Sequence, residues 1–279
     1  MHNFFSDFEE YKFILKRYKN NKNNFYYLPN DIKKFIEEKR ISYFEYVAQL
    51  FLILDQGMYD DLFYFSNDFN IEEIPLKKDT CVTIIDRNGY NLQNILQIEK
   101  KIIRNGAEKI ACDYGVSLDL SKYRDIISEF HKKDIEYLET LGLRLVSGRD
   151  DEFVQQVHEL WRNGLPSYHV PFEHVNYMHH PDHNVICLID NTSTVAGVYW
   201  ACDANRNREY RHIVISPAFR RRGLGSIMLR HAIYDAIAND IKSMRTWIAE
   251  DNTNSLSMHN AVGFKRNGLI AYQYLFKSP

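Results

Sequence analysis

The chain has 279 residues, of which 45% are hydrophobic, so it can form one large or two small globular domains with a substantial core. Its 35 basic and 37 acidic residues give a formal net charge of −2, which argues against a nucleic acid or an anionic membrane as partner. An anion-binding site must therefore depend on a local cluster of residues.

The sequence also argues against a membrane-spanning or secreted protein. No long apolar run is free of charged residues, so we expect no transmembrane helix. Residues 1–10 lack the basic and apolar regions of a signal peptide. The cysteines at positions 81, 112, 187 and 202 have no CxxC spacing, and we expect reduced thiols in a cytoplasmic protein.

In the first half, helices and strands alternate without a Pro/Gly/Ser-rich linker to mark a domain boundary. The residue pattern predicts helices at 9–19, 31–39, 92–105 and 121–141. Short β-rich runs bounded by polar residues predict strands at 62–65, 81–85, 109–112 and 143–146. Segment 43–54 is strongly apolar and fits either a helix or a strand.

The second half has clearer boundaries between its elements. We expect helices at 150–162, 226–239 and 254–262, and strands at 185–189, 195–201, 209–215, 244–249 and 269–276. The order of these elements predicts an α/β fold in which a mixed sheet carries helices on both faces.

A basic, glycine-bearing turn lies between the strand at 209–215 and the next helix. It reads Arg220-Arg221-Arg222-Gly223-Leu224-Gly225. The first turn of a helix offers unpaired N–H groups and the positive end of the helix dipole, and glycines let a ligand approach the backbone. The turn therefore predicts a pyrophosphate cradle, with a plain helix start and solvated arginines as the alternative. It is not a P-loop, because no Gly-Lys-Ser/Thr follows.

This turn resembles motif A of the GNAT superfamily of acyltransferases, Arg/Gln-x-x-Gly-x-Gly/Ala. Downstream, residues 252–264 resemble the family's motif B, Asn-x-x-Ala/Ser-x-x-Leu/Met-Tyr/His-x-x-x-Gly-Phe. The two motifs stand in the family's order, with a predicted strand between them. The resemblance covers the second half of the chain and implies a GNAT fold there.

In the GNAT family the strand before motif A pairs its backbone with pantetheine, and motif A binds the coenzyme A pyrophosphate. The alternative for Ile213 and Ile215 is core packing, and the alternative for Asn252 and Ser255 is helix capping. The resemblance implies an acetyl-CoA site, without a metal, that consists of Ile213, Val214, Ile215, Arg220, Arg221, Arg222, Gly223, Leu224, Gly225, Ser226, Asn252 and Ser255.

The resemblance also implies two catalytic residues. His259 stands where many GNAT members carry a tyrosine that protonates the leaving thiolate, and the alternative is a histidine that packs beside the cofactor. Glu209 has the offset from motif A at which the histone acetyltransferase branch has its general base, and the alternative is an ion pair with Arg208 or Arg211. The next candidates for the base are Tyr210 and His212.

A histidine-rich stretch precedes the strand at 185–189. Its spacing matches no zinc signature, and no acidic or cysteine ligand accompanies it. In a GNAT domain this stretch would help to shape the acceptor pocket, and a plain loop is the main alternative. The histidines are His169, His174, His179, His180 and His183.

The first half lacks an Arg-x-x-Gly-x-Gly turn, although residues 135–145 parallel residues 256–266, which include the end of motif B. This echo suggests a tandem protein, with a degenerate GNAT-like domain at 1–142 and a catalytic domain at 143–279. An unrelated extension that covers the acceptor site is the alternative. Either arrangement predicts one coenzyme A site per chain.

The resemblance implies an N-acetyltransferase that moves an acetyl or short acyl group from acetyl-CoA to a primary amine by direct attack. We expect a small-molecule acceptor rather than a protein, because the first half can enclose the acceptor site. The alternatives are a non-catalytic acyl-CoA-binding regulatory module and an O-acyltransferase.

Overall fold

A computed structural model describes residues 3–18, 29–46, 49–56, 60–65, 78–87, 92–165 and 183–277. Within these ranges no helix is both long enough and apolar enough to cross a membrane. The four cysteines all lie in described segments and are free thiols, with Cys81 and Cys187 buried.

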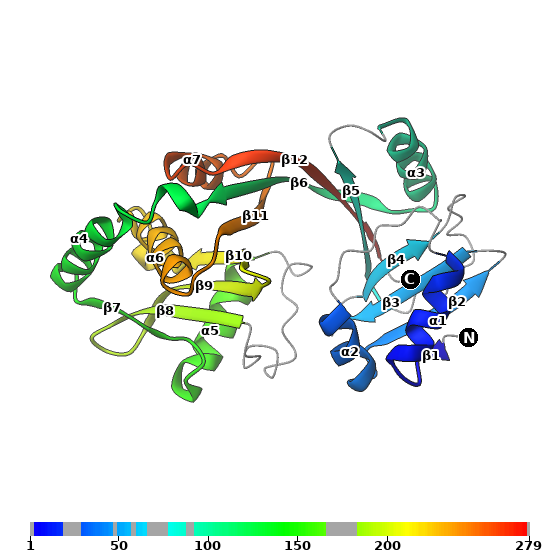
Figure 1. Cartoon of the computed structure of the whole chain (residues 1–279), viewed down its shortest axis with the longest axis horizontal. Coiled ribbons are helices and arrows are strands. Elements are labelled where there is room, and N and C mark those ends of the chain that lie inside the picture. The colour runs from blue at the N-terminus through cyan, green and yellow to red at the C-terminus, as the bar shows by residue number, and fades with distance from the viewer. Residues whose placement is uncertain are drawn as a thin grey trace. The chain divides into compact units, whose positions relative to one another are not determined.

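The chain forms two compact units (Figure 1). The first contains Met1–Asp113 and Leu269–Pro279, and the second contains Tyr114–Gly268. Two long strands, β6 (Glu108–Asp119) and β12 (Lys265–Phe276), each belong partly to one unit and partly to the other. The compact units therefore do not divide at residues 142 and 143, where the sequence suggested a domain boundary.

The first unit is built on a mostly antiparallel sheet. Its strands β1 (Asn3–Phe4), β2 (Ile41–Tyr46), β3 (Gln49–Asp55) and β4 (Asp60–Phe65) pair in chain order, and β4 then pairs in parallel with β5 (Thr80–Arg87). Residues 269–276 of β12 pair antiparallel with β5. The helices are α1 (Phe8–Tyr18), α2 (Pro29–Glu37) and α3 (Leu92–Arg104).

Segment 43–54, which fitted a helix or a strand, forms parts of the antiparallel strands β2 and β3. Leu50 to Leu54 are all buried, so both faces of β3 are covered and its residues show no alternation of polar and apolar types. Phe51 and Ile53 belong to a core that also contains Ile95 and Ile102 of α3. A fully covered strand of this kind cannot be told from a buried helix by periodicity.

The second unit contains a mixed sheet in the order β6-β11-β10-β9-β8-β7. Strands β7, β8, β9 and β10 pair antiparallel in this order, and β10 pairs in parallel with β11. Its remaining elements are the 3₁₀ turn η1 (Leu120–Lys122), α4 (Ile127–Thr140), β7 (Leu143–Ser147), α5 (Asp151–Gly164), β8 (His183–Asp190), β9 (Val195–Ala204), β10 (Asn207–Ile215), the 3₁₀ turn η4 (Pro217–Phe219), α6 (Leu224–Ala238), β11 (Ser243–Ala249) and α7 (Thr253–Ala261).

Helices α5 and α6 cover opposite faces of this sheet. Gly164 at the end of α5 lies against Val214, whereas Met228 of α6 and Ile215 meet at Gly197. Because successive residues of a strand point to opposite faces, the two contacts lie on different sides of β10. The expected α/β fold with helices on both faces is confirmed.

Residues from before position 143 contribute to the core of the second unit. Five side chains, each at most 3% exposed, join the cluster that contains Leu229, Met244 and Phe264. These five are Val116, Leu118, Leu120, Ile127 and Leu138. The short strand predicted at 109–112 is the twelve-residue β6, and the helix predicted at 121–141 begins only at Ile127, after η1.

The two units repeat one order of elements. Three antiparallel strands are followed by a parallel partner, a helix and a long strand, as β2-β3-β4-β5-α3-β6 and as β8-β9-β10-β11-α7-β12. The segments that join the parallel strands differ, because 216–242 carries the Arg-Gly turn and α6, whereas 66–79 is short and contains no glycine. The described part of the first unit thus follows the same plan, and its sequence contains no Arg-x-x-Gly-x-Gly turn.

Candidate active site

The site begins where two parallel strands separate. β10 and β11 are paired only from Asn207 with Ser243 to Glu209 with Arg245. Beyond this point β10 continues along β9 to Ile215, and β11 continues to Ala249 (Figure 1). The facing backbone edges of the two strands are then not paired with each other, so an extended ligand can bond to them.

Ile213, Val214 and Ile215 lie on this separated part of β10. Val214 is buried, and Ile213 and Ile215 pack against the core below α6. Core packing of the side chains is confirmed, while the main chain remains on the separated edge. The two interpretations made from the sequence are therefore compatible, and pantetheine binding stays a prediction.

The turn before α6 has the backbone of an anion cradle. Arg221 and Gly223 both have positive φ, 63° and 73°, and α6 starts at Leu224. The first backbone donor of this region with a helical partner is the N–H of Ile227, which donates to Gly223 O at 3.2 Å. The N–H groups of Gly223 to Ser226 are the unpaired donors of the helix start.

Gly223 and Gly225 have different surroundings in the structure. A Cβ on Gly223 would meet no atom within 4 Å, so this side of the turn is open to a ligand. A Cβ on Gly225 would lie 3.3 Å from Met258 Sδ, so Gly225 allows α6 to approach α7 closely. An open turn with unpaired N–H groups at the positive end of a helix suits a phosphate.

Three arginines surround the cradle. Arg220 Nε donates to Ile215 O at 3.1 Å, and the Arg222 guanidinium lies 5.6 Å from the centre of the Phe219 ring. Among the described residues, no carboxylate forms an ion pair with Arg220, Arg221 or Arg222. The turn is therefore a strongly positive patch on a chain of net charge −2.

Helix α4 contacts both the turn before α6 and α6 itself. The sequence did not predict these contacts. Tyr137 Oη donates to Arg222 O at 3.5 Å, and the Arg230 guanidinium binds Asp134 through two hydrogen bonds of 2.6 and 2.7 Å. His131 and His231 are hydrogen-bonded at 2.9 Å. These contacts join segments far apart in the sequence, and no local pattern marks them.

Asn252 is the N-cap of α7. Its Oδ1 accepts a hydrogen bond from Ser255 N at 3.0 Å, which confirms the capping interpretation. Gly263 follows the helix with φ of 84°, and Phe264 is buried, as expected for a helix C-terminus. Cofactor contacts of Asn252 and Ser255 stay predictions.

His259 lies on the buried side of α7, with only 2% of its surface exposed. Its Nδ1 lies 2.8 Å from Ser255 O, and its ring packs edge-on against Tyr210 and Phe264. Burial lowers the pKa of His259, and the hydrogen bond to Ser255 O opposes that shift only in part. This shift favours the neutral ring, and the role of His259 as proton donor stays a prediction.

Glu209 is held between two arginines. Its carboxylate lies 2.9 Å from the Arg245 guanidinium and 3.1 Å from Arg211 Nε. Burial raises the pKa of Glu209, but the charges of Arg211 and Arg245 outweigh burial, so the pKa lies below its ordinary value. The expected ion pair with Arg211 is confirmed, and Arg245 is a partner that only the folded sheet brings close.

Arg208 is the other expected partner of Glu209. Its side chain points to the face of the sheet opposite to that of Glu209. Its side chain is 1% exposed and binds both carboxylate oxygens of Asp203 at 2.7 Å and Asp235 at 2.6 Å. Asn184 donates to the same Asp235 oxygen at 2.6 Å. The alternation along a strand separates Arg208 from Glu209, so Arg208 belongs to a buried structural network.

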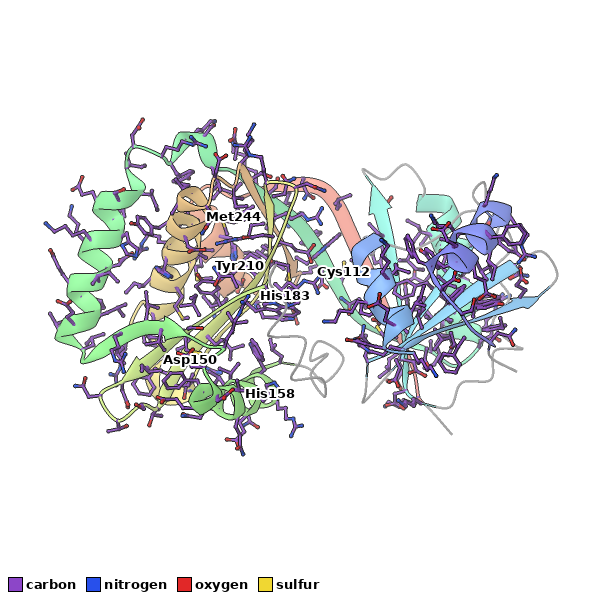
Figure 2. The ribbon with its side chains drawn as sticks, turned by 60° about the horizontal axis from the view of Figure 1, so that its bottom comes forward. Cys112, Asp150, His158, His183, Tyr210 and Met244 are labelled. Carbon is purple, nitrogen blue, oxygen red and sulfur yellow. The ribbon has the colours of Figure 1, made fainter. Side chains whose placement is uncertain are left out.

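The two remaining candidates for the general base, Tyr210 and His212, lie on either side of a β-bulge in β10. The register of β10 with β9 shifts between Tyr210 and His212. Tyr210 lies in the core below α6 with Met244 (Figure 2). His212 instead packs on Trp200, with a ring separation of 5.7 Å. Because Trp200 also contacts Trp161 of α5, His212 lies on the α5 face.

Of the histidine-rich stretch, His183 lies in the described part of the chain, with its ring 5.3 Å from Trp200. His169, His174, His179 and His180 fall outside the described residues. The described residues contain no group of three or more His, Cys, Asp or Glu side chains that could hold a metal ion.

The sequence model of the acetyltransferase (GNAT) family matches residues 153–264. These residues run from α5 to the end of α7 and include the separated strands β10 and β11 and the turn before α6. This segment is a GNAT acetyltransferase domain. The GNAT match includes both expected motifs, from Arg220 to Gly225 and from Asn252 to Phe264. A search of curated protein sequences gave no match to the chain.

Solved structures share the GNAT fold over both units. A Drosophila protein has a TM-score of 0.56 at 13% identity and covers 99% of this chain and 98% of its own. A tandem GNAT protein from the clavulanic acid biosynthesis pathway has a TM-score of 0.52 at 14% identity, with 83% and 79% covered. A GCN5-related N-acetyltransferase from Sphaerobacter thermophilus has a TM-score of 0.54 at 8% identity, with 82% and 76% covered. These similarities concern the fold alone.

Proposed function

We propose that the protein transfers an acetyl or short acyl group from acyl-CoA to a primary amine by direct attack. Members of the GNAT family are acetyltransferases, and residues 153–264 match that family. The observation that carries the proposal is a coincidence in one unit. An open turn at the start of α6 follows strand β10, and the C-terminal part of β10 is separated from its parallel neighbour β11.

The two features fit the two parts of coenzyme A. The unpaired N–H groups from Gly223 to Ser226 would hold the pyrophosphate, with charge from Arg221 and Arg222. The main chain of residues 213–215 would pair with the amides of pantetheine. The thioester would then lie near Tyr210 and Glu209, where the strands part, and a backbone amide of β10 would polarise its carbonyl.

The acceptor amine must be neutral when it attacks. Glu209 is the proposed base, and its lowered pKa keeps the carboxylate ionised throughout the neutral range. A carboxylate with a low pKa accepts a proton weakly, so the acceptor's own deprotonation would control the rate. We propose a small amine as acceptor.

We also propose that the protein works in the cytoplasm. Its four cysteines are free thiols, two of them buried, and free thiols suit a reducing compartment.

The proposal is tested by thiol release from acetyl-CoA in the presence of a panel of small primary amines. Amine-dependent thiol release with an acetylated product detected by mass spectrometry is the expected result. Release with alcohols and not with amines would indicate O-acylation. Tight binding of acetyl-CoA without turnover on any acceptor would contradict catalysis and favour a binding module.

A further inference from the structure

Three charged side chains form a cluster at the point where β10 and β11 separate. The Glu209 carboxylate lies 2.9 Å from the Arg245 guanidinium and 3.1 Å from Arg211 Nε. Within the described residues, two guanidinium charges therefore surround one carboxylate charge, and the cluster has a net charge of +1. A cluster with this balance attracts an anion and still offers one carboxylate to a cation.

The cluster lies on the face of the sheet away from α6. Arg208 donates to Ala232 O of α6 at 3.2 Å, and Met244 packs in the core with α6. Glu209 and Arg245 are the next residues of the same two strands, and they stand opposite each other in the register. Because side chains alternate along a strand, both point away from α6 and from the filled core beneath it.

Arg245 is the most exposed member of the cluster. Its side chain is 58% exposed, whereas those of Glu209 and Arg211 are each 25% exposed. Within the described part of the chain its guanidinium donates to Glu209 alone. A guanidinium has five N–H donors in a planar fork that matches a carboxylate. Arg245 can therefore bind a second carboxylate without giving up Glu209.

The same arrangement suits Glu209 to hold a cation. Despite burial, the charges of Arg211 and Arg245 lower the pKa of Glu209 below its ordinary value, so its carboxylate is ionised at neutral pH. An ionised carboxylate binds an ammonium group through charge-assisted hydrogen bonds. A ligand that carries an ammonium and a carboxylate close together can bind Glu209 and Arg245 at once, because these two groups are themselves only 2.9 Å apart.

We propose that this cluster binds an α-amino acid as acyl acceptor, with the ammonium group on Glu209 and the carboxylate on the exposed side of Arg245. The inference rests on the proposed function, because it names the acceptor class of the same site. The ammonium group loses one proton to solvent, and its nitrogen forms a bond to the thioester carbon. The carbon–sulfur bond then breaks with its electron pair on sulfur, which takes a second proton from the nitrogen. Arg245 sets the specificity for the carboxylate.

Equilibrium binding tests the acceptor class without turnover. The full chain, in the presence of excess coenzyme A, would be titrated with standard α-amino acids and with the α-carboxamide of each, and binding would be followed by ligand-observed NMR. The carboxamide keeps the amine and the side chain and loses only the carboxylate charge. At least one amino acid should bind at least about tenfold more tightly than its carboxamide. Equal binding of every acid and its carboxamide, or binding of no amino acid, would overturn the proposal.

Variants of Arg245 test which residue provides the preference for the acid. Arg245→Gln should weaken binding of the amino acid at least about tenfold and leave binding of the carboxamide unchanged, while Arg245→Lys should keep part of the preference because it keeps the charge. Arg206→Gln is the matched control, since Arg206 is 50% exposed, pairs with Asp240 and precedes the paired part of β10. A preference that survives Arg245→Gln, or that Arg206→Gln removes equally, would overturn the role of Arg245.

Acyl transfer separates this inference from the proposed function. A wild type that binds an amino acid but releases no thiol from acetyl-CoA would refute the proposed function and leave recognition of the amino acid by the cluster intact. A wild type that acylates amines with and without a carboxylate equally well would support the proposed function and overturn the inference. In the active enzyme, Arg245→Gln should raise KM for the amino acid at least about tenfold with little change in kcat.

Discussion

A chain that begins at Leu143 should not fold, although it contains every residue that matches the GNAT family. The truncation removes Val116, Leu118, Leu120, Ile127 and Leu138, which are all at most 3% exposed in the core of the second unit. Complete burial of one such side chain contributes about 1.5–3 kcal/mol, so the five together contribute roughly 7–15 kcal/mol. That sum is comparable to the whole stability of a domain, about 5–15 kcal/mol.

Urea unfolding followed by circular dichroism would measure this effect. Residues 143–279 should give no cooperative transition, whereas the full chain should unfold cooperatively. Within the full chain, Leu138→Ala should lower the free energy of unfolding by about 2–5 kcal/mol. Phe130→Ala is the matched control on α4, where Phe130 is 49% exposed, and it should change stability by less than about 0.5 kcal/mol. A truncated chain that unfolds cooperatively at the same urea concentration would refute the reasoning.

Three further predictions concern charged groups. Glu209→Gln should lower kcat/KM at least about 100-fold if Glu209 is the base, and wild-type activity in a thiol-release assay would eliminate that role. Arg208→Met should cost about 3–5 kcal/mol in urea unfolding, because it leaves two carboxylates without their buried partner; a loss below about 1 kcal/mol would contradict this. Burial and the neighbouring His131 lower the pKa of His231 from 6.5 to about 4, so the unfolded chain binds a proton between these values and the folded chain does not. Stability should therefore fall by up to about 3 kcal/mol from pH 7 to pH 4, and a pH profile unchanged by His231→Gln would exclude this residue as the cause.

The sequence was most informative where the information is local. The turn from Arg220 to Gly223 before α6 and the N-cap at Asn252 depend on residues that are neighbours in the chain, and the structure has both helix starts close to where the sequence predicts them. The same holds for α3 and for the strands β8 to β11, whose boundaries fall within three residues of the prediction. Segment 43–54 was ambiguous because a strand covered on both faces has no polar alternation.

Long-range contacts could not be predicted in this way. The ion pair of Glu209 with Arg245 joins two strands whose register is set by the whole sheet. Because of the bulge after Tyr210, the side chains of Tyr210 and His212 lie on opposite faces of the sheet. No residue type at this position predicts a bulge. The contribution of α4 to the core and to the cradle likewise depends on the packing of α4 against α6, not on either helix alone.

The most direct test of the central claim is calorimetric titration of the purified chain with acetyl-CoA. The account predicts saturable binding of one molecule per chain, and at least about tenfold weaker binding in Gly223→Ala, because the new methyl group occupies the open side of the cradle. Gly106→Ala is the matched control, since Gly106 also has a positive φ and open space around it but ends α3 in the first unit. Absence of binding by the unaltered chain, or equal affinities of Gly223→Ala and Gly106→Ala, would contradict the account.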